Sequence, residues 1–146
     1  MNADSIKGLF FLDTNVFVYT FDRTDKAKQR IAREWVRQAL LTQRGITGAQ
    51  VVQEFINVAL KKFENPMGVT EAREYLNGVM RPLCQHFPVM PSFDRALLIR
   101  EETGYAWYDS LIITAAIEAK CSWLISEDLQ HGRKIGPVTV HNPFRG

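Results

Sequence analysis

Short apolar runs alternate along the chain with longer amphipathic stretches, a pattern that predicts strands separated by helices. The run 8–12 is apolar and aromatic and ends abruptly at Asp13, which predicts a buried strand. The run 121–126 predicts a second buried strand, and Asp128 follows it closely. Weaker strand patterns lie at Ile46, at 86–90, where Pro88 favours a sheet edge, and at 138–140.

Apolar residues at helical spacing predict the helices between these strands. They cover a stretch from Asp25 to Gly45 and the ranges 47–63, 69–79, 95–103 and 109–119. Thr47 and Gln50 have the spacing of a capping box at the start of the second helix. Because no two strand patterns form an adjacent hairpin, the chain is predicted to be an α/β domain with a mostly parallel sheet. Ligands of such sheets bind beyond the carboxyl ends of the strands.

The composition is that of one globular domain spanning 1–146, with 46% hydrophobic and 23% charged residues. The first residues lack the pattern of a signal peptide, and the first apolar run is far too short to span a membrane. Cys84 and Cys121 are the only cysteines and have no metal-binding spacing. We therefore expect a cytoplasmic protein without a membrane segment.

Four acids are expected to meet at one edge of the predicted sheet. Asp13 and Asp128 each follow a buried strand, and Asp109 lies in the first turn of a strongly apolar helix, where the helix dipole favours a carboxylate. Glu54 lies in a polar stripe along its helix, beside buried positions. Clustered carboxylates repel one another, so this arrangement predicts a hard divalent cation, Mg²⁺ or Mn²⁺.

Each of these acids also has an ordinary structural explanation. Asp is a common cap and turn residue, which would account for Asp13, Asp109 and Asp128, and Glu54 would be a surface residue of its helix. Only their joint placement indicates a site. The net charge of +2 is small, but setting four acids aside in a metal site leaves the 18 basic residues in clear excess, which would suit a polyanion. Solvated helix faces explain those basic residues equally well.

Several other sites that use an acid after a strand are excluded by missing residues. Asp13 is followed by Thr14 and Asn15, so the second Asp of a haloacid-dehalogenase-type phosphatase is absent. No GxGxxG, GxxxxGK[ST] or GxSxG motif occurs, and no setting for a nucleophilic Cys is present. The three His residues lack metal-binding spacing, which leaves His131 at most a supporting role.

The segments 12–16, 50–55, 108–112 and 126–130 together resemble the PIN domain, and more closely the VapC-type toxins of bacterial toxin–antitoxin pairs. The resemblance covers nearly the whole chain, although 62–105 carries no motif. It implies a three-layer α/β/α fold and a Mg²⁺- or Mn²⁺-dependent endoribonuclease. The acidic site that it implies consists of Asp13, Glu54, Asp109 and Asp128, with Asn15 and Ser126 as supporting polar residues.

The resemblance also implies a mechanism and partners. A metal-activated water would attack the phosphorus of RNA in line and leave a 5′-phosphate and a 3′-hydroxyl. A cognate antitoxin would block the acidic site with a basic side chain, and the protein would form a homodimer. Three alternatives remain open: a PIN-like nuclease acting on another RNA or on DNA, a non-catalytic RNA- or protein-binding module, and a phosphohydrolase of small molecules.

Overall fold

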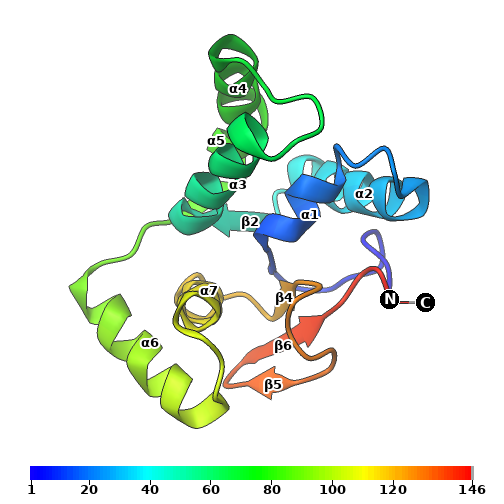
Figure 1. Cartoon of the computed structure of the whole chain (residues 1–146). Helices are drawn as coiled ribbons and strands as arrows, with labels where there is room; N and C mark the ends of the chain where they lie inside the picture. Colours follow the sequence, from blue (N-terminus) through cyan, green and yellow to red (C-terminus); the bar gives the residue numbers. More distant parts are fainter. Residues whose placement is uncertain (146) are drawn as a thin grey trace.

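A six-stranded sheet forms the centre of the computed structural model, which describes residues 1–145 (Figure 1). The strands are β1 (Phe10–Leu12), β2 (Gly45–Gly48), β3 (Cys84–His86), β4 (Trp123–Ile125), β5 (Lys134–Ile135) and β6 (Val138–His141). Their order across the sheet is β3-β2-β1-β4-β6-β5. All neighbouring pairs are parallel except β5 and β6, which are antiparallel.

The helices precede, follow and connect these strands. They are α1 (Thr14–Tyr19), α2 (Lys26–Thr42), α3 (Ala49–Lys61), α4 (Val69–Tyr75), the π-helical segment η1 (Leu76–Met80), α5 (Arg81–Leu83), α6 (Met90–Thr103) and α7 (Trp107–Glu118). Asp25 caps α2 by accepting a hydrogen bond from the Lys28 amide at 3.1 Å. Gly104, with a positive φ of 77°, ends α6.

The central strand β1 is buried on both faces because helices cover the sheet from both sides. Successive side chains of a strand point to opposite faces. The Phe10 ring packs edge-on against Trp35 of α2, with ring centroids 5.4 Å apart. Phe11 instead lines a cavity together with Ile112 of α7. Figure 1 shows α2 and α7 on opposite sides of the strands. The predicted three-layer α/β/α fold with a mostly parallel sheet is therefore confirmed.

The strand order changes direction between β1 and β4. The chain runs outward from β1 through β2 to β3, and then returns to the other side of β1 to form β4. At such a switch point the two connections leave in opposite directions and a crevice opens beyond the strand ends. Leu12 and Ile125 are paired neighbours, so the residues that follow them, Asp13 and Ser126, emerge side by side at this crevice.

The predicted start of the helix 47–63, which is α3, was wrong. Gly48, and not Thr47, is the residue before α3, and the helix has no side-chain cap. Thr47 instead lies in β2, fully buried, and its hydroxyl donates a 2.9 Å hydrogen bond to the Leu12 carbonyl. That bond satisfies the carbonyl of Leu12, the last residue of β1. If the Thr47 hydroxyl capped α3 instead, this carbonyl would lack that donor. Gly45 likewise belongs to β2 and does not end α2, which stops at Thr42.

Two further predictions of local structure were wrong. The edge strand is Cys84–His86 rather than 86–90, because Pro88 has no amide hydrogen and the Val89 amide bonds to the Ser92 hydroxyl at the start of α6. A hairpin does occur, between β5 and β6. Ile135 pairs with Val138, and Gly136 between them takes a positive φ of 56°. The two residues of β5 are too few to show a strand pattern.

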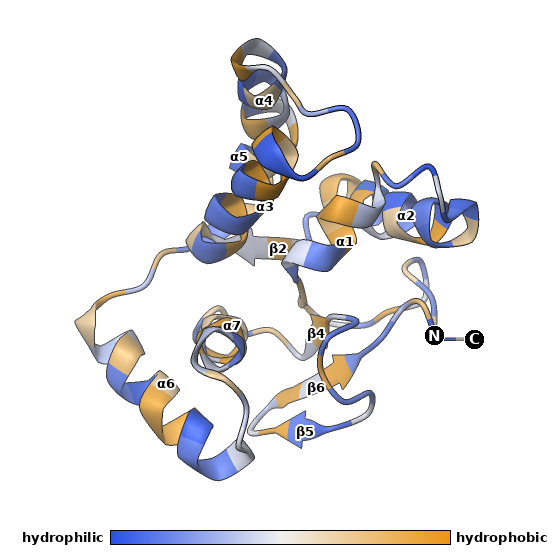
Figure 2. Cartoon of the chain, in the orientation of Figure 1, coloured by the Kyte–Doolittle hydropathy of each residue, from blue (hydrophilic) through white to orange (hydrophobic). Residues whose placement is uncertain are grey.

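The helix α6 lies at the surface of the protein, and most of its residues are exposed to solvent. Figure 2 shows hydrophobic as well as hydrophilic residues along it, and Met90, Leu97 and Leu98 are exposed. Its contacts are mainly with α7. Within residues 1–145, no helix combines the length and the apolar character that crossing a membrane requires.

Candidate active site

Asp13 is the most deeply buried acid of the protein's crevice, with only 6% of its surface exposed. It follows β1 and caps α1: its Oδ1 accepts a 2.7 Å hydrogen bond from the Thr14 amide. Its Oδ2 accepts a 2.7 Å bond from the Ser126 hydroxyl, at the end of β4. Burial raises the pKa of Asp13 to about 7 despite these two bonds, and the nearby carboxylates of Asp128 and Glu54 add to the increase.

Glu54 reaches the same place from α3. Its Oε1 accepts a 2.7 Å hydrogen bond from the Thr14 hydroxyl, forty residues away in the chain. Thr14 therefore contacts two of the acids, Asp13 through its amide and Glu54 through its hydroxyl. One turn before Glu54, the side-chain amide of Gln50 donates a 3.2 Å bond to the Tyr108 carbonyl in the first turn of α7. These bonds connect α3 with both α1 and α7 at the crevice.

Asn15 and Ser126 hold the acid that follows β4. The Asn15 amide nitrogen donates to Asp128 Oδ2 at 3.1 Å and to the Ser126 hydroxyl oxygen at 3.4 Å. That hydroxyl oxygen also accepts from the Asp128 amide at 3.2 Å. A hydroxyl has one hydrogen to donate, and Ser126 donates it to Asp13. The two polar residues predicted to support the site thus lie between the two strand-end acids.

Asp109 lies in the first turn of α7, as predicted, and faces the other three acids. Burial raises its pKa, and repulsion from Asp128 and Glu54 raises it further. Its carboxylate makes no hydrogen bond within residues 1–145. Asp109 is therefore the least restrained of the four carboxylates.

The four acids come from four elements and line one cavity of about 420 Å³. The structure thus brings together all four residues that the sequence predicted as a site. As the side chains stand, no three His, Cys, Asp or Glu residues within 1–145 are close enough to ligate one ion. The donor set is nevertheless all oxygen and carries excess negative charge, which is the chemistry that attracts a hard cation.

Glu127 is a fifth acid on the cavity, and its partners were not predicted. The Tyr19 hydroxyl donates to Glu127 Oε1 at 2.5 Å, and the Lys28 ammonium donates to Oε2 at 2.6 Å. These bonds to Glu127 and Tyr19 raise the pKa of Lys28. Lys28 lies in α2, 99 residues from Glu127. Nothing in the local sequence around either residue indicates the pair, which neutralises this acid and leaves the other four to face the cavity.

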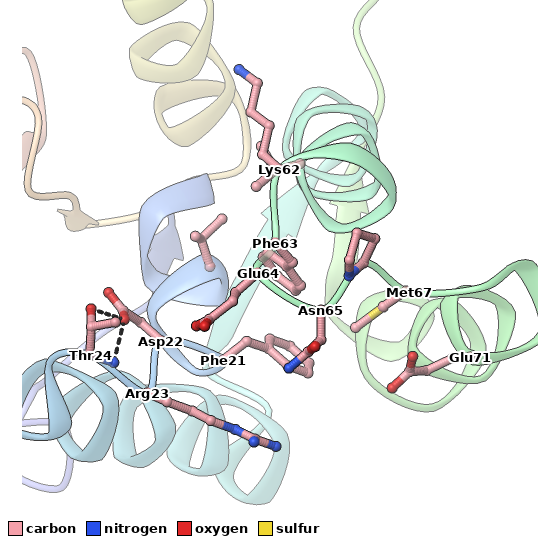
Figure 3. A pocket seen from close by; sticks show the side chains of 13 residues that line it. Phe21, Asp22, Arg23, Thr24, Lys62, Phe63, Glu64, Asn65, Met67 and Glu71 are labelled. Carbon is pink, nitrogen blue, oxygen red and sulfur yellow. Dashed lines mark hydrogen bonds between the residues drawn. The ribbon is translucent and has the colours of Figure 1, made fainter.

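A second cavity of about 420 Å³ adjoins the acidic one and shares Val18 and Val58 with it. It lies between the end of α1 and the loop that joins α3 to α4. Figure 3 shows Phe21, Phe63 and Met67 among its lining residues. The remaining lining includes the cations Arg23 and Lys62 and the acids Asp22, Glu64 and Glu71. This second cavity therefore combines an apolar lining with charges of both signs.

His131 is not part of the acidic site. It lies near His141, with ring centroids 5.3 Å apart, and its Nδ1 accepts a bond from the Asn142 amide. These residues line a separate cavity beside Met1.

Comparison with known families gives one match. A model of the PIN domain matches residues 10–135, a range that begins at β1 and includes all four acids as well as Asn15 and Ser126. No curated protein matches the chain.

Proposed function

The chain belongs to the PIN domain family, and from that membership we propose that it is a Mg²⁺- or Mn²⁺-dependent endoribonuclease. PIN domains are generally nucleases and typically use divalent metal ions. One observation carries the proposal for this chain: carboxylates from four separate elements line a single cavity at the switch point of the sheet. We further propose that residues 1–146 form one nuclease domain.

The donor set fits a hydrated cation. Mg²⁺ is usually bound by one or two carboxylates and keeps several waters, so it does not need three carboxylates in direct contact. We propose Asp13 and Asp109 as the direct ligands, because a strand end and a first helical turn are rigid supports. Asp128 and Glu54 would complete the site, directly or through water. When bound, the ion lowers the pKa of water and stabilises negative charge on the phosphate and the departing oxygen.

The residues of the chain would position these groups. Ser126 and Thr14 fix both oxygens of Asp13, and Asn15 fixes Asp128. The Thr14 hydroxyl holds one oxygen of Glu54 and leaves the other to orient the attacking water. Such positioning matters because a carboxylate misplaced by about an ångström loses much of its catalytic effect. Hydrolysis by water would leave a 5′-phosphate and a 3′-hydroxyl.

We propose that this nuclease is the VapC-type toxin of a toxin–antitoxin pair and acts on cytoplasmic RNA. The support is the resemblance of the four motif segments. The cavity shown in Figure 3 supports an antitoxin partner, because its apolar lining and mixed charges suit a peptide segment and it adjoins the acidic cavity. A basic side chain of that segment would reach the acids and neutralise them. Co-expression with the neighbouring reading frame, followed by co-purification, tests this partner.

We also propose a homodimer. The support is a group of exposed apolar residues on α6 and on the segment before it: Phe87, Val89, Met90, Leu97 and Leu98. A monomer rarely leaves so many large apolar side chains together in water. Replacing Leu97 and Leu98 by Glu should convert a dimer to a monomer in sedimentation experiments, and a wild-type protein that sediments as a monomer would refute the proposal.

Cleavage of RNA by the Asp109→Asn variant tests the nuclease proposal. We expect the variant to lose almost all activity, because it removes a carboxylate that faces the cavity without altering a hydrogen bond within residues 1–145. Asp94→Asn, an exposed acid of α6, is the matched control and should retain activity. Chelation by EDTA should abolish cleavage, and added Mg²⁺ or Mn²⁺ should restore it.

The chemistry of the products separates the alternatives. A 2′,3′-cyclic phosphate together with indifference to EDTA would refute a metal-activated water. Preference for matched DNA over RNA would indicate a different nuclease, and metal binding without turnover would indicate a non-catalytic module. Hydrolysis of phosphomonoesters irrespective of polymer length would indicate a small-molecule phosphohydrolase.

A further inference from the structure

Another cavity, of about 380 Å³, lies between the start of α3, the edge strand β3 and the first turns of α6 and α7. Its lining is mainly apolar and includes three aromatic side chains, those of Phe11, Phe93 and Trp107, with Tyr108 at the boundary to the acidic cavity. Trp107 is only half-buried, so a ligand in this cavity could contact its ring. We call this space the aromatic cavity.

The aromatic cavity adjoins the acidic one. Gln50, Tyr108 and Ile112 line both cavities. The hydrogen bond from the Gln50 amide to the Tyr108 carbonyl spans the boundary between them. A chain molecule with its phosphate at the acids therefore has the aromatic cavity as the neighbouring space for its next group.

The wall of the aromatic cavity opposite α3 is held in place by a polar network. His86 Nε2 and the Ser92 hydroxyl each lie 2.7 Å from Glu118 Oε1, and Arg95 binds the other oxygen of Glu118. The hydrogen-bonding capacity of His86 and Ser92 toward a ligand is therefore largely used within the protein. Gln53, also on the lining, is exposed and makes no side-chain hydrogen bond within residues 1–145, so its amide is free to bind a polar edge.

We propose that the aromatic cavity binds one unstacked nucleobase of the RNA next to the cleaved phosphodiester, with the base stacked on Trp107 and its edge facing Gln53. The inference rests on the proposed ribonuclease function. Proteins that read single-stranded RNA commonly stack splayed bases on aromatic rings and bind the base edges with polar groups. The aromatic cavity offers both features beside the acids. It would determine which nucleotide is placed at the cleavage site.

The position of the cavity favours a nucleobase over a side chain of a second copy of this protein. The exposed apolar residues Leu97 and Leu98 of α6 do not line it, whereas Gln50 and Tyr108 connect it to the acids. A base is flat and apolar on its faces and polar at its edge, which matches Trp107 and Gln53. Its ribose and phosphate would extend toward the acidic cavity.

Binding of oligoribonucleotides that each lack one base tests the inference. The Asp109→Asn variant would be used as the background to prevent cleavage, and affinity would be measured by anisotropy of a labelled strand with Mg²⁺ present. We expect removal of one particular base to weaken binding about tenfold. Trp107→Leu should abolish the penalty for that base, and Trp107→Phe, which keeps an aromatic face, should restore it. Trp123→Leu, the same substitution at a Trp that lines neither the aromatic nor the acidic cavity, should behave like the background.

The possible outcomes separate this inference from the proposed function. If the penalty for base removal is the same with Trp107→Leu, the base does not bind at Trp107, even if the wild-type protein cleaves RNA. If Trp107→Leu changes only the sedimentation of the protein, the cavity belongs to an interface between copies and the inference is wrong. If the wild-type protein fails to cleave RNA but the base penalty depends on Trp107, the nuclease proposal fails and the base site stands.

Discussion

The two sides of the acidic cavity differ in how firmly they hold their carboxylates. On the strand side, Asp13 and Asp128 are connected through Ser126 and Asn15 by hydrogen bonds of 2.7 to 3.4 Å. On the helix side, the carboxylate of Asp109 makes no hydrogen bond within residues 1–145. The strand side is therefore organised in advance, whereas the helix side keeps a carboxylate free to adjust. A site that must accept a cation and a phosphate benefits from both properties.

The largest expected effect on activity comes from removing the negative charge of Asp13 on the strand side of the acidic cavity. Asp13→Asn should lower RNA cleavage by about a thousandfold, the upper end of the loss for one positioned electrostatic group. The variant should fold, because Asn is nearly isosteric with Asp and its amide oxygen can still accept the bond from the Thr14 amide, although its NH₂ group cannot accept the bond from the Ser126 hydroxyl. Single-turnover cleavage together with circular dichroism measures both properties. Activity within tenfold of wild type would show that Asp13 is only a cap of α1.

The next effect concerns the connection between the two strand ends. Ser126→Ala removes the donor to Asp13 and the acceptor for Asn15 and the Asp128 amide. We expect a loss of about 10- to 100-fold in activity or metal affinity, which is typical for residues that orient ligands. The free energy of unfolding should fall by about 1–3 kcal/mol, because buried partners lose their hydrogen bonds. Ser122→Ala, at an exposed position just before β4, is the control. An equal effect of both substitutions would contradict the special role of Ser126.

The stability of the metal-free protein should depend on pH through Asp13. The folded protein keeps the Asp13 proton up to a pH of about 7, whereas the unfolded chain releases it near 3.8. Between these values the folded state binds more protons at Asp13, so the contribution of Asp13 to the free energy of unfolding should fall as pH rises through this window. The effect is on the order of 1.4 kcal/mol per unit of pKa shift. Urea unfolding with EDTA at several pH values measures it.

Two comparisons sharpen this prediction. Asp13→Asn has no proton to release at this position, so the fall in stability that Asp13 contributes over this window should be absent from the variant. A divalent ion should stabilise the wild-type protein most near neutral pH, where the four acids repel one another most. The same change of stability with pH in the metal-free wild-type protein and in Asp13→Asn between pH 4 and 7 would refute the raised pKa of Asp13.

The smallest effect is expected at the neutralised fifth acid. Lys28→Met leaves Glu127 without its cation and adds an unpaired charge to the cavity. We expect a loss of up to about 1 kcal/mol in stability, since the pair is partly exposed, and a few-fold change in activity. Lys28→Met combined with Glu127→Gln should recover most of the loss, because it removes both charges. No recovery in the double variant would show that Lys28 acts through some other contact.

The residues that could be predicted from sequence are those whose local pattern is distinctive. Asp13 ends an apolar run, Asp109 lies in the first turn of an apolar helix and Glu54 lies within a polar stripe, so their elements were identified correctly. The bonds that organise them could not be predicted. Thr14 bonds to Glu54 forty residues away, and Lys28 bonds to Glu127 across 99 residues. Such pairs depend on how helices pack, so no local sequence pattern predicts them.

Errors in the predicted fold have the same origin. Thr47 has the spacing of a helix cap, but its hydroxyl satisfies the Leu12 carbonyl of the neighbouring strand. The predicted helix 69–79 in fact continues through the π-helical segment Leu76–Met80 into Arg81–Leu83, so Pro82 lies inside a helix and not beyond its end. Pro is tolerated at that position because it lies in the first turn of the short helix.

The strand order has a consequence for the synthesis of the protein. The central strand β1 is made first, but one of its two neighbours is β4, which ends at Ile125. Until translation passes residue 128, the nascent chain therefore carries Asp13 and Glu54 without the strand that brings Ser126 and Asp128 beside them. The acidic cavity is complete only when Asp128 has left the ribosome. Chains that terminate before this residue would lack the cavity, so the proposed nuclease would not be released in active form from its own unfinished synthesis.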